Sequence, residues 1–555
     1  MGFIRVRLLD FPLERDEGEY AYAGQLMLQG VPPYQECYNM KWPGAYVAYA
    51  AIMAVFGQTA AGIHLGMLCA SLASALLMFL IGRRMGGGGM GVVAAGTQAL
   101  LAVNPSTLGL AGHATHFVVL SALAGIWLLM VPLKKIGLWR CVAAGIFFGL
   151  ACMMKQSGAV FGVFAATWLA WRGLAGDEEQ SFEEGGRTSR DARGVALRLG
   201  SLAAGGMLPL LAMAGMLAAA GVWDKFWHWT VEYGWAYVGI LTISQGLENL
   251  ALQTEKLWAA APGLWLLAAF GIVFLWCDPA LRRWRFFLVV FAVFSFAGVC
   301  PGFYFREHYF LLLLPAAGLL CGAAWHAMAC LAERFLRCVA RRSGTGHAAI
   351  LKGMNRPGFA AAAGGIAGGV FVLAAAQSLA VSGDVFFRLT PEQACRRVYG
   401  GNPFPESLEV ARHIAEHCPP NSRIAVLGSE PEIYFYSHRR AATGYIYMYP
   451  LMEPQPFASK MQLDMIRELE SAAPEYLVLV SAPTSWLVRP ESDRAIFEWV
   501  DRYNREQMQL DGFVELLPDN RTESHWDLAG REIHPQTNCW LAIFKRKQAA
   551  LRRAY

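Results

Sequence analysis

The sequence predicts a polytopic α-helical membrane protein that carries a soluble α/β domain at its C-terminal end. Three observations support this fold class. The 555 residues are 55% hydrophobic and only 16% charged, with a mean hydropathy of +0.34, whereas soluble domains average about 25% charged residues. Apolar runs of membrane-crossing length recur through the first two thirds of the chain. After Val381 this pattern gives way to short amphipathic segments.

The apolar runs define the expected membrane region. A helix needs about 20 apolar residues to cross a bilayer, and about ten runs approach that length. They are Ala60–Gly82, Met90–Ala111, Thr115–Leu133, Leu138–Met154, Ser157–Leu174, Leu199–Val222, Leu257–Cys277, Phe286–Cys300, His308–Cys330 and Gly358–Val381. Tyr46–Phe56 is shorter and lies between Pro43 and Gly57, so we interpret it as an interfacial helix.

The loops between these runs alternate in charge, which predicts their orientation. One set holds Arg83, Arg84, Lys134, Lys135, Arg140, Arg172, Arg187, Arg190, Arg193, Arg198, Arg282, Arg283, Arg285, Arg334, Arg337, Arg341, Arg342, Lys352 and Arg356. The other set holds only Lys155, Lys225, Lys256 and Arg306. The positive-inside rule places the first set in the cytoplasm. The segment around Asp16, the basic residues of the second set and everything after Val381 are then expected on the periplasmic face of a bacterial inner membrane.

A polar motif precedes the first long apolar run. It comprises Arg15–Tyr20 (RDEGEY) and Tyr38–Gly44 (YNMKWPG). Ionisable groups at the edge of a membrane region are candidates for function. The run DEGEYAYAGQLMLQGVPPYQECYNMKWPGAYVAYAAIMAVFGQT resembles the first periplasmic loop of bacterial GT-C glycosyltransferases of family 39, which are related to protein mannosyltransferases and the lipid A aminoarabinose transferase. In that family a hydrophobic helix precedes the motif. Met1–Glu14 is too short and charged for one, so either the natural chain begins further upstream, which we favour, or this protein lacks that helix.

The resemblance implies residue roles. Asp16 matches the catalytic aspartate, the base for the acceptor hydroxyl, and Glu17 follows it as in the family motif. Lys41 resembles the lysine that contacts the carrier phosphate, although Trp42 separates it from Pro43. Lys155 stands where relatives carry a second phosphate-contacting lysine. Without the resemblance, the acidic residues would be read as a solvated loop and Lys155 as a snorkelling side chain.

A further element of the resemblance lies at Tyr304–Phe310 (YFREHYF), with Pro315 beyond it. It resembles the family's HYF…P element, and it makes Arg306, His308 and Tyr309 candidate substrate-binding residues. An arginine fork suits a phosphate, while His308 and Tyr309 are equally compatible with packing at a helix start. We expect Lys41, Lys155 and Arg306 to converge on the carrier phosphate.

Other motifs indicate less specific roles. His113 and His116 would make a weak metal site with only two neutral ligands. Gly86–Gly89 lacks the Lys-Ser/Thr of a phosphate loop and predicts a turn. The segment 223–258 is rich in Trp and Tyr, which is typical of an interfacial belt and, secondly, of a sugar or lipid contact surface. The 12 cysteines contain no CxxC pair, so no zinc site or disulfide framework is indicated, and a disulfide among Cys395, Cys418 and Cys539 has no support in the pattern.

The C-terminal part alternates helical and strand patterns. Helices are expected at Glu406–His417 and Met461–Ala472, and strands at Ile424–Leu427, Tyr476–Val480 and Trp540–Phe544. This alternation predicts an α/β domain with a mainly parallel sheet. The expected domains are therefore a catalytic loop with interfacial helices at 1–59, the transmembrane domain at 60–381 and the periplasmic α/β domain at 382–555.

The resemblance implies an inverting membrane glycosyltransferase of the cell envelope. Its donor would be a sugar on a polyprenyl phosphate and its acceptor a lipid, such as lipopolysaccharide, a glycan or a protein. We expect membrane lipids but no nucleic acid among its partners, and no cofactor; a divalent metal is not indicated. Two alternatives stay open. An O-antigen ligase or polymerase would use a diphosphate donor, and a lipid or polysaccharide transporter would have charged or broken helices near the bilayer midplane.

Overall fold

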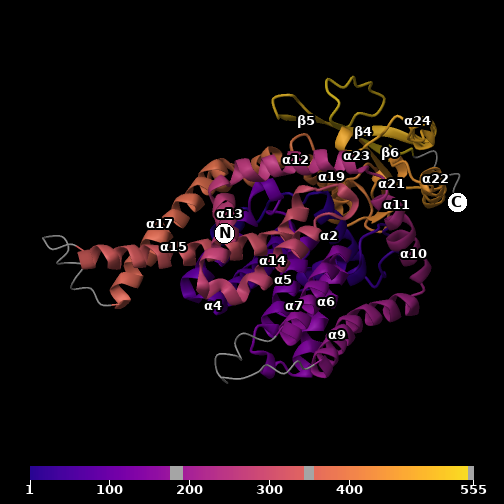
Figure 1. Ribbon diagram of the computed structural model, residues 1–555. Coiled ribbons are helices and arrows are strands. Elements are labelled where there is room, and N and C mark those ends of the chain that lie inside the picture. Colours follow the sequence, from indigo (N-terminus) through magenta and orange to yellow (C-terminus); the bar gives the residue numbers. More distant parts are fainter. Residues whose placement is uncertain (176–191, 343–355, 548–555) are drawn as a thin grey trace. The chain divides into compact units, whose positions relative to one another are not determined.

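The computed structural model describes residues 1–175, 192–342 and 356–547, and it is predominantly helical (Figure 1). Arg187, Arg190 and Lys352 of the basic loops lie outside the described residues. The chain forms two compact units. The helical unit comprises Met1–Arg5, Met67–Met213 and Ile243–Arg388, and the α/β unit comprises Val6–Gly66, Ala214–Thr242 and Leu389–Tyr555. The division into three domains at residues 59 and 381 stays a prediction.

The helical unit begins with a tight hairpin. α4 (Ala60–Leu101) is interrupted at Gly86 and at Gly87, whose φ of 88° favours glycine. The two arms pack closely, because a Cβ added at Gly82 would lie 2.9 Å from the Cα of Gly91. The predicted turn at Gly86–Gly89 is thus confirmed, and it joins the first two apolar runs.

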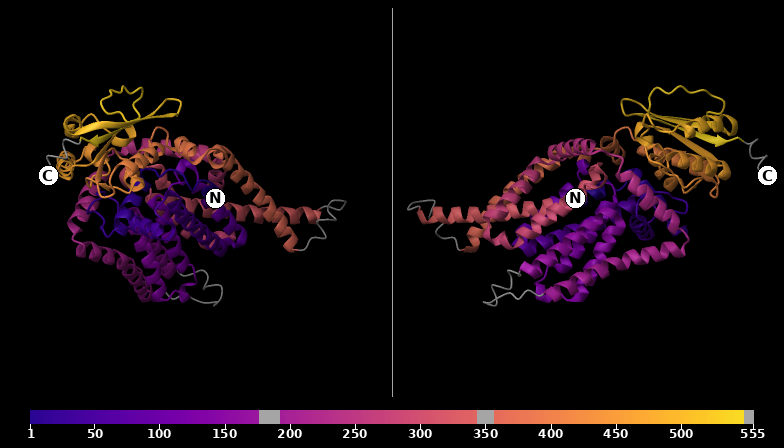
Figure 2. Two further views of the ribbon diagram at one scale, coloured as in Figure 1. Left: turned by 180° about the vertical axis from the view of Figure 1, so that it is seen from behind. Right: turned by 45° about the vertical axis from the view of Figure 1, so that its right-hand side comes forward.

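The other apolar runs also fall in helices. These are α5 (Ala114–Leu129), α6 (Leu138–Met154), α7 (Ala159–Ala175), α9 (Ala192–Ala219), α12 (Ile243–Ala260), α13 (Pro262–Cys277), α14 (Arg285–Ala297), α15 (Leu314–Arg342) and α17 (Arg356–Val381). α15 and α17 run side by side (Figures 1 and 2). Between α7 and α14 the core is aromatic: Phe164 and Trp168 pack edge-on against Phe287, with ring centroids 5.2 and 4.9 Å apart.

Helix length supports a membrane protein but does not fix the number of crossings. Within the described residues, four helices are long and apolar enough to span a bilayer: Ala60–Leu101, Ala192–Ala219, Leu314–Ala340 and Pro357–Val381. α12 and α13 make a fifth candidate as a pair bent by 106°. The apolar run expected at Leu257–Cys277 falls mostly in α13 and begins at the end of α12, because Pro262 starts a new helix and its ring cannot continue α12. About ten crossings stays a prediction.

The α/β unit contains the N-terminal motif and a six-stranded sheet. Its helices are α2 (Arg15–Leu28), α3 (Gly44–Phe56), α10 (Trp223–Trp227), α11 (Gly234–Val238), α18 (Pro391–Tyr399), α19 (Phe404–His417), α20 (Glu432–Ser437), α21 (Tyr449–Met452), α22 (Ala458–Ala472), α23 (Pro483–Trp486) and α24 (Ala495–Gln507). A π-helical turn, η4 (His228–Tyr233), links α10 to α11. α3 packs against α2, which confirms a helix where Tyr46–Phe56 was expected.

The strands are β1 (Arg423–Leu427), β2 (Arg440–Ala441), β3 (Tyr476–Ser481), β4 (Met508–Leu516), β5 (Thr522–Trp526) and β6 (Trp540–Arg546), in the order β2-β1-β3-β6-β4-β5. Only the pairs of β1 with β2 and β3 are parallel. β3–β6, β6–β4 and β4–β5 are antiparallel, so the prediction of a mainly parallel sheet was wrong. β4 and β5 form a hairpin, and β6 returns between β3 and β4. Figure 2 shows these strands at the yellow end of the colour scale.

All twelve cysteines are free, including Cys395, Cys418 and Cys539. The three soluble-domain cysteines therefore form no disulfide in this structure.

Candidate active site

The N-terminus of α2 places the acidic motif. Glu14 caps the helix, and its carboxylate accepts a hydrogen bond of 3.0 Å from the backbone N–H of Glu17. Acidic residues in a first turn are favoured by the helix dipole, and here they are Asp16 and Glu17. Gly18 allows α2 to approach α20, because a Cβ at this position would lie 2.6 Å from the backbone nitrogen of Glu432. The motif is thus fixed by packing as well as by capping.

Asp16, Glu19 and Lys41 form a charged cluster. The Lys41 ammonium donates to Asp16 Oδ1 at 2.7 Å and to Glu19 Oε2 at 2.6 Å. The Glu19 side chain is fully buried, whereas the Asp16 and Lys41 side chains are 15% and 21% exposed. Lys41 therefore joins an enclosed carboxylate to one that reaches the surface.

Tyrosines complete this cluster. The Tyr46 hydroxyl donates to Glu19 Oε1 at 2.6 Å, and the Tyr447 hydroxyl donates to Asp16 Oδ1 at 3.1 Å. The Lys41 ammonium also lies 4.6 Å from the centre of the Tyr20 ring, within cation–π distance. Neither Glu19 nor the tyrosines were among the residues predicted from sequence. Tyr447 is 431 residues from Asp16 along the chain, so no local pattern could have indicated it.

The charges in the cluster depend on one another. Burial raises the pKa of Glu19, and the Lys41 ammonium opposes this shift. Burial also disfavours the charge on Lys41, yet the carboxylates of Asp16 and Glu19 raise the pKa of that ammonium well above its ordinary value. Lys41 is consequently a cation at neutral pH, held by two acidic groups.

Glu17 lies in a different environment from Asp16. It is fully buried, and its Oε1 lies 3.2 Å from His64 Nε2 and 3.5 Å from the Tyr49 hydroxyl. Consecutive helical residues do not face each other, which explains the separation. The contacts of Glu17 with Tyr49 and His64 hold α2 against α3 and the start of α4. The catalytic role expected for Glu17 stays a prediction.

Three of the predicted substrate-binding residues meet in the helical unit. The Lys155 ammonium lies 3.3 Å from the centre of the Tyr309 ring. The His308 ring packs edge-on against Tyr309, with centroids 4.8 Å apart, and stacks on His113 at 4.2 Å. His113 therefore joins this group, although the sequence pattern alone gave it little weight. Arg306, the other predicted residue in this unit, precedes the 3-10 turn Glu307–Leu312, and its guanidinium lies 5.6 Å from the Tyr304 ring centre.

A buried ion pair anchors the C-terminal part of the α/β unit to α2. Arg15 donates to Glu430 Oε1 at 2.9 Å and to the Tyr449 hydroxyl at 2.7 Å. Burial opposes the guanidinium charge, but Tyr449 and Glu430 raise the pKa of Arg15 above its ordinary value. The segment that carries Tyr447 is thereby held beside Asp16.

One cluster in the helical unit has donor atoms that could hold a metal. Asp278, His326 and Cys330 each bring one such atom within 4.8 Å of the others. His326 Nδ1 lies 2.8 Å from Asp278 Oδ2, which is also the geometry of an ordinary ion pair.

The apolar helices and the likeness to solved structures define the class: a multi-pass membrane protein with the GT-C fold and a C-terminal α/β domain. The chain is similar to ArnT from Cupriavidus metallidurans bound to undecaprenyl phosphate, at a TM-score of 0.53 and 14% identity, covering 96% of this chain and 97% of that one. It is also similar to ArnT from the same organism in the apo state, at a TM-score of 0.50 and 15% identity, covering 86% of this chain and 90% of that one.

The third similar structure is the archaeal oligosaccharyltransferase AglB from Archaeoglobus fulgidus in complex with an inhibitory peptide and a dolichol-phosphate. Its TM-score is 0.49 and its identity 12%, covering 99% of this chain and 75% of that one. No protein-family model and no curated protein matches the sequence. At these identities the likeness to ArnT concerns the fold, and it confirms the fold class predicted from the sequence.

Proposed function

We propose that the protein is a membrane glycosyltransferase that moves a sugar from a polyprenyl phosphate to a hydroxyl of a lipid, glycan or protein acceptor. The observation that carries this proposal is the Asp16–Lys41–Glu19 cluster, in which Asp16 reaches the surface. The cluster occurs in a fold shared with ArnT, whose structure was solved with undecaprenyl phosphate bound.

Asp16 is the general base in this proposal. The acceptor oxygen attacks the anomeric carbon as Asp16 takes the hydroxyl proton. The bond between that carbon and the phosphate oxygen breaks, and the configuration inverts. Asp16 becomes neutral on taking the proton, while Lys41 keeps its bond to Glu19. The buried pair therefore holds the ammonium in place through the proton transfer.

The leaving phosphate needs positive charge but no general acid, because a phosphate ester oxygen departs as an already stable anion. We assign this role to Lys41, Lys155 and Arg306, with His308 and Tyr309 lining the same site. The packing of Lys155 on Tyr309 and of Tyr309 on His308 supports a shared site for these three residues. Lysine offers a point charge and arginine a bidentate fork to phosphate oxygens.

The site faces the periplasm in this proposal. The basic residues on alternate loops support a location of the Asp16 segment and the residues after Val381 on the outer face of the inner membrane. Nucleotide sugars are cytosolic, so an outer-facing enzyme requires a donor that the membrane carries. A polyprenyl phosphate meets that requirement.

A donor panel tests the proposal. Purified protein in lipid is given radiolabelled hexoses and pentoses on undecaprenyl phosphate, the same sugars on undecaprenyl diphosphate, and cell-envelope lipid as acceptor. We expect transfer from a monophosphate donor with inverted anomeric configuration. Transfer from the diphosphate donor alone would instead indicate the ligase or polymerase alternative. Movement of intact lipid-linked sugar across proteoliposomes without transfer would indicate the transporter.

A further inference from the structure

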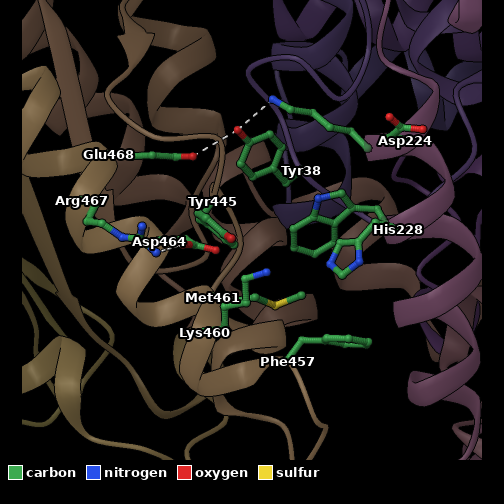
Figure 3. Close-up of a pocket in the computed structure, with 12 residues that line it drawn as sticks. Tyr38, Asp224, His228, Tyr445, Phe457, Lys460, Met461, Asp464, Arg467 and Glu468 are labelled. Carbon is green, nitrogen blue, oxygen red and sulfur yellow. Dashed lines mark hydrogen bonds and ion pairs between the residues drawn. The ribbon is translucent and has the colours of Figure 1, made fainter.

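A pocket of about 480 Å³ that is lined by aromatic and charged side chains lies within the α/β unit, apart from the Asp16 cluster (Figure 3). Its volume falls in the range of about 300–1,000 Å³ that is usual for ligand sites. One wall comes from α10 and η4 and carries Asp224 and His228. The facing wall comes from α22 and the residue before it, and carries Phe457, Lys460 and Asp464. The proposed function uses none of these residues.

Aromatic rings form the base of the pocket. Tyr38 stacks on Trp229 with centroids 5.7 Å apart and an interplanar angle of 21°. Tyr445 packs edge-on against Tyr38 at 5.1 Å, and Phe457 packs in the same way against His228 at 5.0 Å. Trp229 and Tyr445 are buried, whereas Tyr38, His228 and Phe457 are partly exposed. The Tyr38 ring is stacked on Trp229 and also lies 4.7 Å from the Lys225 ammonium. The partly exposed rings of Phe457 and His228 are therefore the ones available to a ligand. Aromatic ring faces carry negative quadrupole charge, so they attract the positively polarised C–H face of a sugar ring.

Polar groups surround the aromatic base. The Tyr38 hydroxyl links the two walls, because it donates to Glu468 Oε1 at 3.1 Å and accepts from the Lys225 ammonium at 3.1 Å (Figure 3). Gly444 makes room for this ring, since a Cβ there would lie 2.4 Å from it. Asp224 and Lys460 are exposed at the rim. The Tyr38 hydroxyl therefore holds the two walls together, and charged side chains are exposed at the edge of the pocket.

The charges of the lining balance. Acidic and basic side chains occur in equal number: Asp224, Asp464 and Glu468 against Lys225, Lys460 and Arg467. A balanced lining gives no net attraction to a phosphate or to a polycation. Carboxylates accept hydrogen bonds and ammonium groups donate them, and each sugar hydroxyl does both. The lining thus suits an uncharged, hydroxyl-rich ligand.

Two short chain segments connect the pocket to the Asp16 cluster. Tyr38 is three residues before Lys41, and Tyr445 is two residues before Tyr447, which bonds to Asp16. A chain advances at most about 3.6 Å per residue, so the backbones of the two sites lie within about 11 Å. A glycan of a few sugar units could occupy the pocket and present a hydroxyl near Asp16.

We propose that this pocket binds an uncharged oligosaccharide part of the acceptor. This inference rests on the proposed function in one respect: it takes the oligosaccharide to be part of the acceptor, the molecule that receives the sugar. The binding of an uncharged oligosaccharide does not depend on the proposed function, because it is argued from the aromatic rings and the balanced charges of the lining.

Direct binding tests the inference without turnover. The full chain in detergent is titrated with maltotriose, mannotriose and galactotriose by calorimetry and saturation-transfer NMR, with phosphoethanolamine as a probe of a zwitterionic lipid head group. We expect at least one trisaccharide to bind. The double variant Asp224→Ala/Lys460→Ala should weaken that binding at least about tenfold through lost hydrogen bonds. Both residues are exposed, and an unchanged melting temperature would show that the variant folds.

Matched controls separate this inference from the proposed function. Asp501→Asn changes an exposed aspartate on α24, outside the pocket, and should bind as the wild type does. Asp16→Asn should also bind normally, because binding needs no base. Failure of every trisaccharide to bind, equal binding by the double variant, or displacement by phosphoethanolamine would overturn the inference even if sugar transfer occurs. Trisaccharide binding by a protein that transfers no sugar would overturn the proposed function and leave the pocket's ligand class intact.

Discussion

At the scale of residues, the site depends on one cation between two carboxylates. Replacing Lys41 by methionine should leave Asp16 and the buried Glu19 facing each other without the ammonium that now bonds to both. Breaking a buried pair by removing one partner costs about 3–5 kcal/mol of folding free energy. Thermal melting at neutral pH should show a strong loss for Lys41→Met. Adding Glu19→Gln should recover part of it, since the uncompensated buried charge is gone.

The same cation predicts a pH dependence. The pKa of Lys41 is raised in the folded protein above its ordinary value of 10.5. The stability that its charge contributes is therefore fully present below about pH 10.5 and is lost as the pH rises through the raised folded value. Between pH 9 and pH 12, the wild type should lose more stability than Lys41→Met. Parallel melting curves for the two proteins would contradict the coupling of Lys41 to the carboxylates.

The proposed phosphate contacts make a separate prediction. Lys155→Ala and Arg306→Ala should each lower kcat by about 10²–10³-fold, because they would remove charge aimed at the leaving group. Lys41→Arg should rescue only part of the activity, because a planar fork and a point charge differ in geometry. The matched control is Lys256→Ala, whose ammonium is 58% exposed and pairs with Glu307. Rates for Lys155→Ala and Arg306→Ala equal to that of the control would remove both residues from the site.

At the scale of elements, Gly18 allows α2 to lie against α20. A Cβ at Gly18 would meet the backbone of Glu432 at 2.6 Å, and backbone cannot swing aside. We expect Gly18→Ala to destabilise the protein by about 1–3 kcal/mol through overpacking. Gly215→Ala in α9 is the control, because no atom lies within 4 Å of its added Cβ and alanine favours helix. Equal melting temperatures for the two variants would mean that α2 and α20 are not closely packed.

The elements also show what the sequence can and cannot predict. Periodic segments such as α19, α22 and β3 were predicted correctly, because each has an apolar face that must be buried. The strand β5 was missed because Thr522–Trp526 is mostly polar. The strand β4 was missed because a bulge before Gly512 breaks the alternation of side chains between the two faces of the sheet. Because this antiparallel hairpin was missed, the sheet was wrongly predicted to be mainly parallel.

For the site as well, only the residues that belong to a local sequence pattern could be predicted. The resemblance identified Asp16 and Lys41, which lie in one short segment. It did not identify Glu19 as the second partner of Lys41, nor Tyr447, whose contact with Asp16 exists only in the folded chain. Tertiary partners of this kind leave no local pattern in a single sequence.

At the scale of the whole molecule, the alternating basic loops predict the topology. Reporter fusions after Arg84 and after Arg397 should report opposite sides of the membrane, with Arg84 in the cytoplasm. A fusion that reports only from the periplasm and one that reports only from the cytoplasm should be used at each position. A cytoplasmic signal after Arg397 would contradict the outer location of the α/β unit.

The central claim is that Asp16 takes the proton from an acceptor hydroxyl during sugar transfer from a polyprenyl phosphate. The most direct test compares transfer rates of purified wild type, Asp16→Asn and Asp10→Asn, the last changing an exposed aspartate in the same N-terminal segment. The amide keeps the shape of Asp16 but cannot serve as the base, so its rate should fall by about 10²–10⁴-fold, with melting temperature preserved and Asp10→Asn unaffected. Transfer by Asp16→Asn within threefold of the wild type would contradict the account.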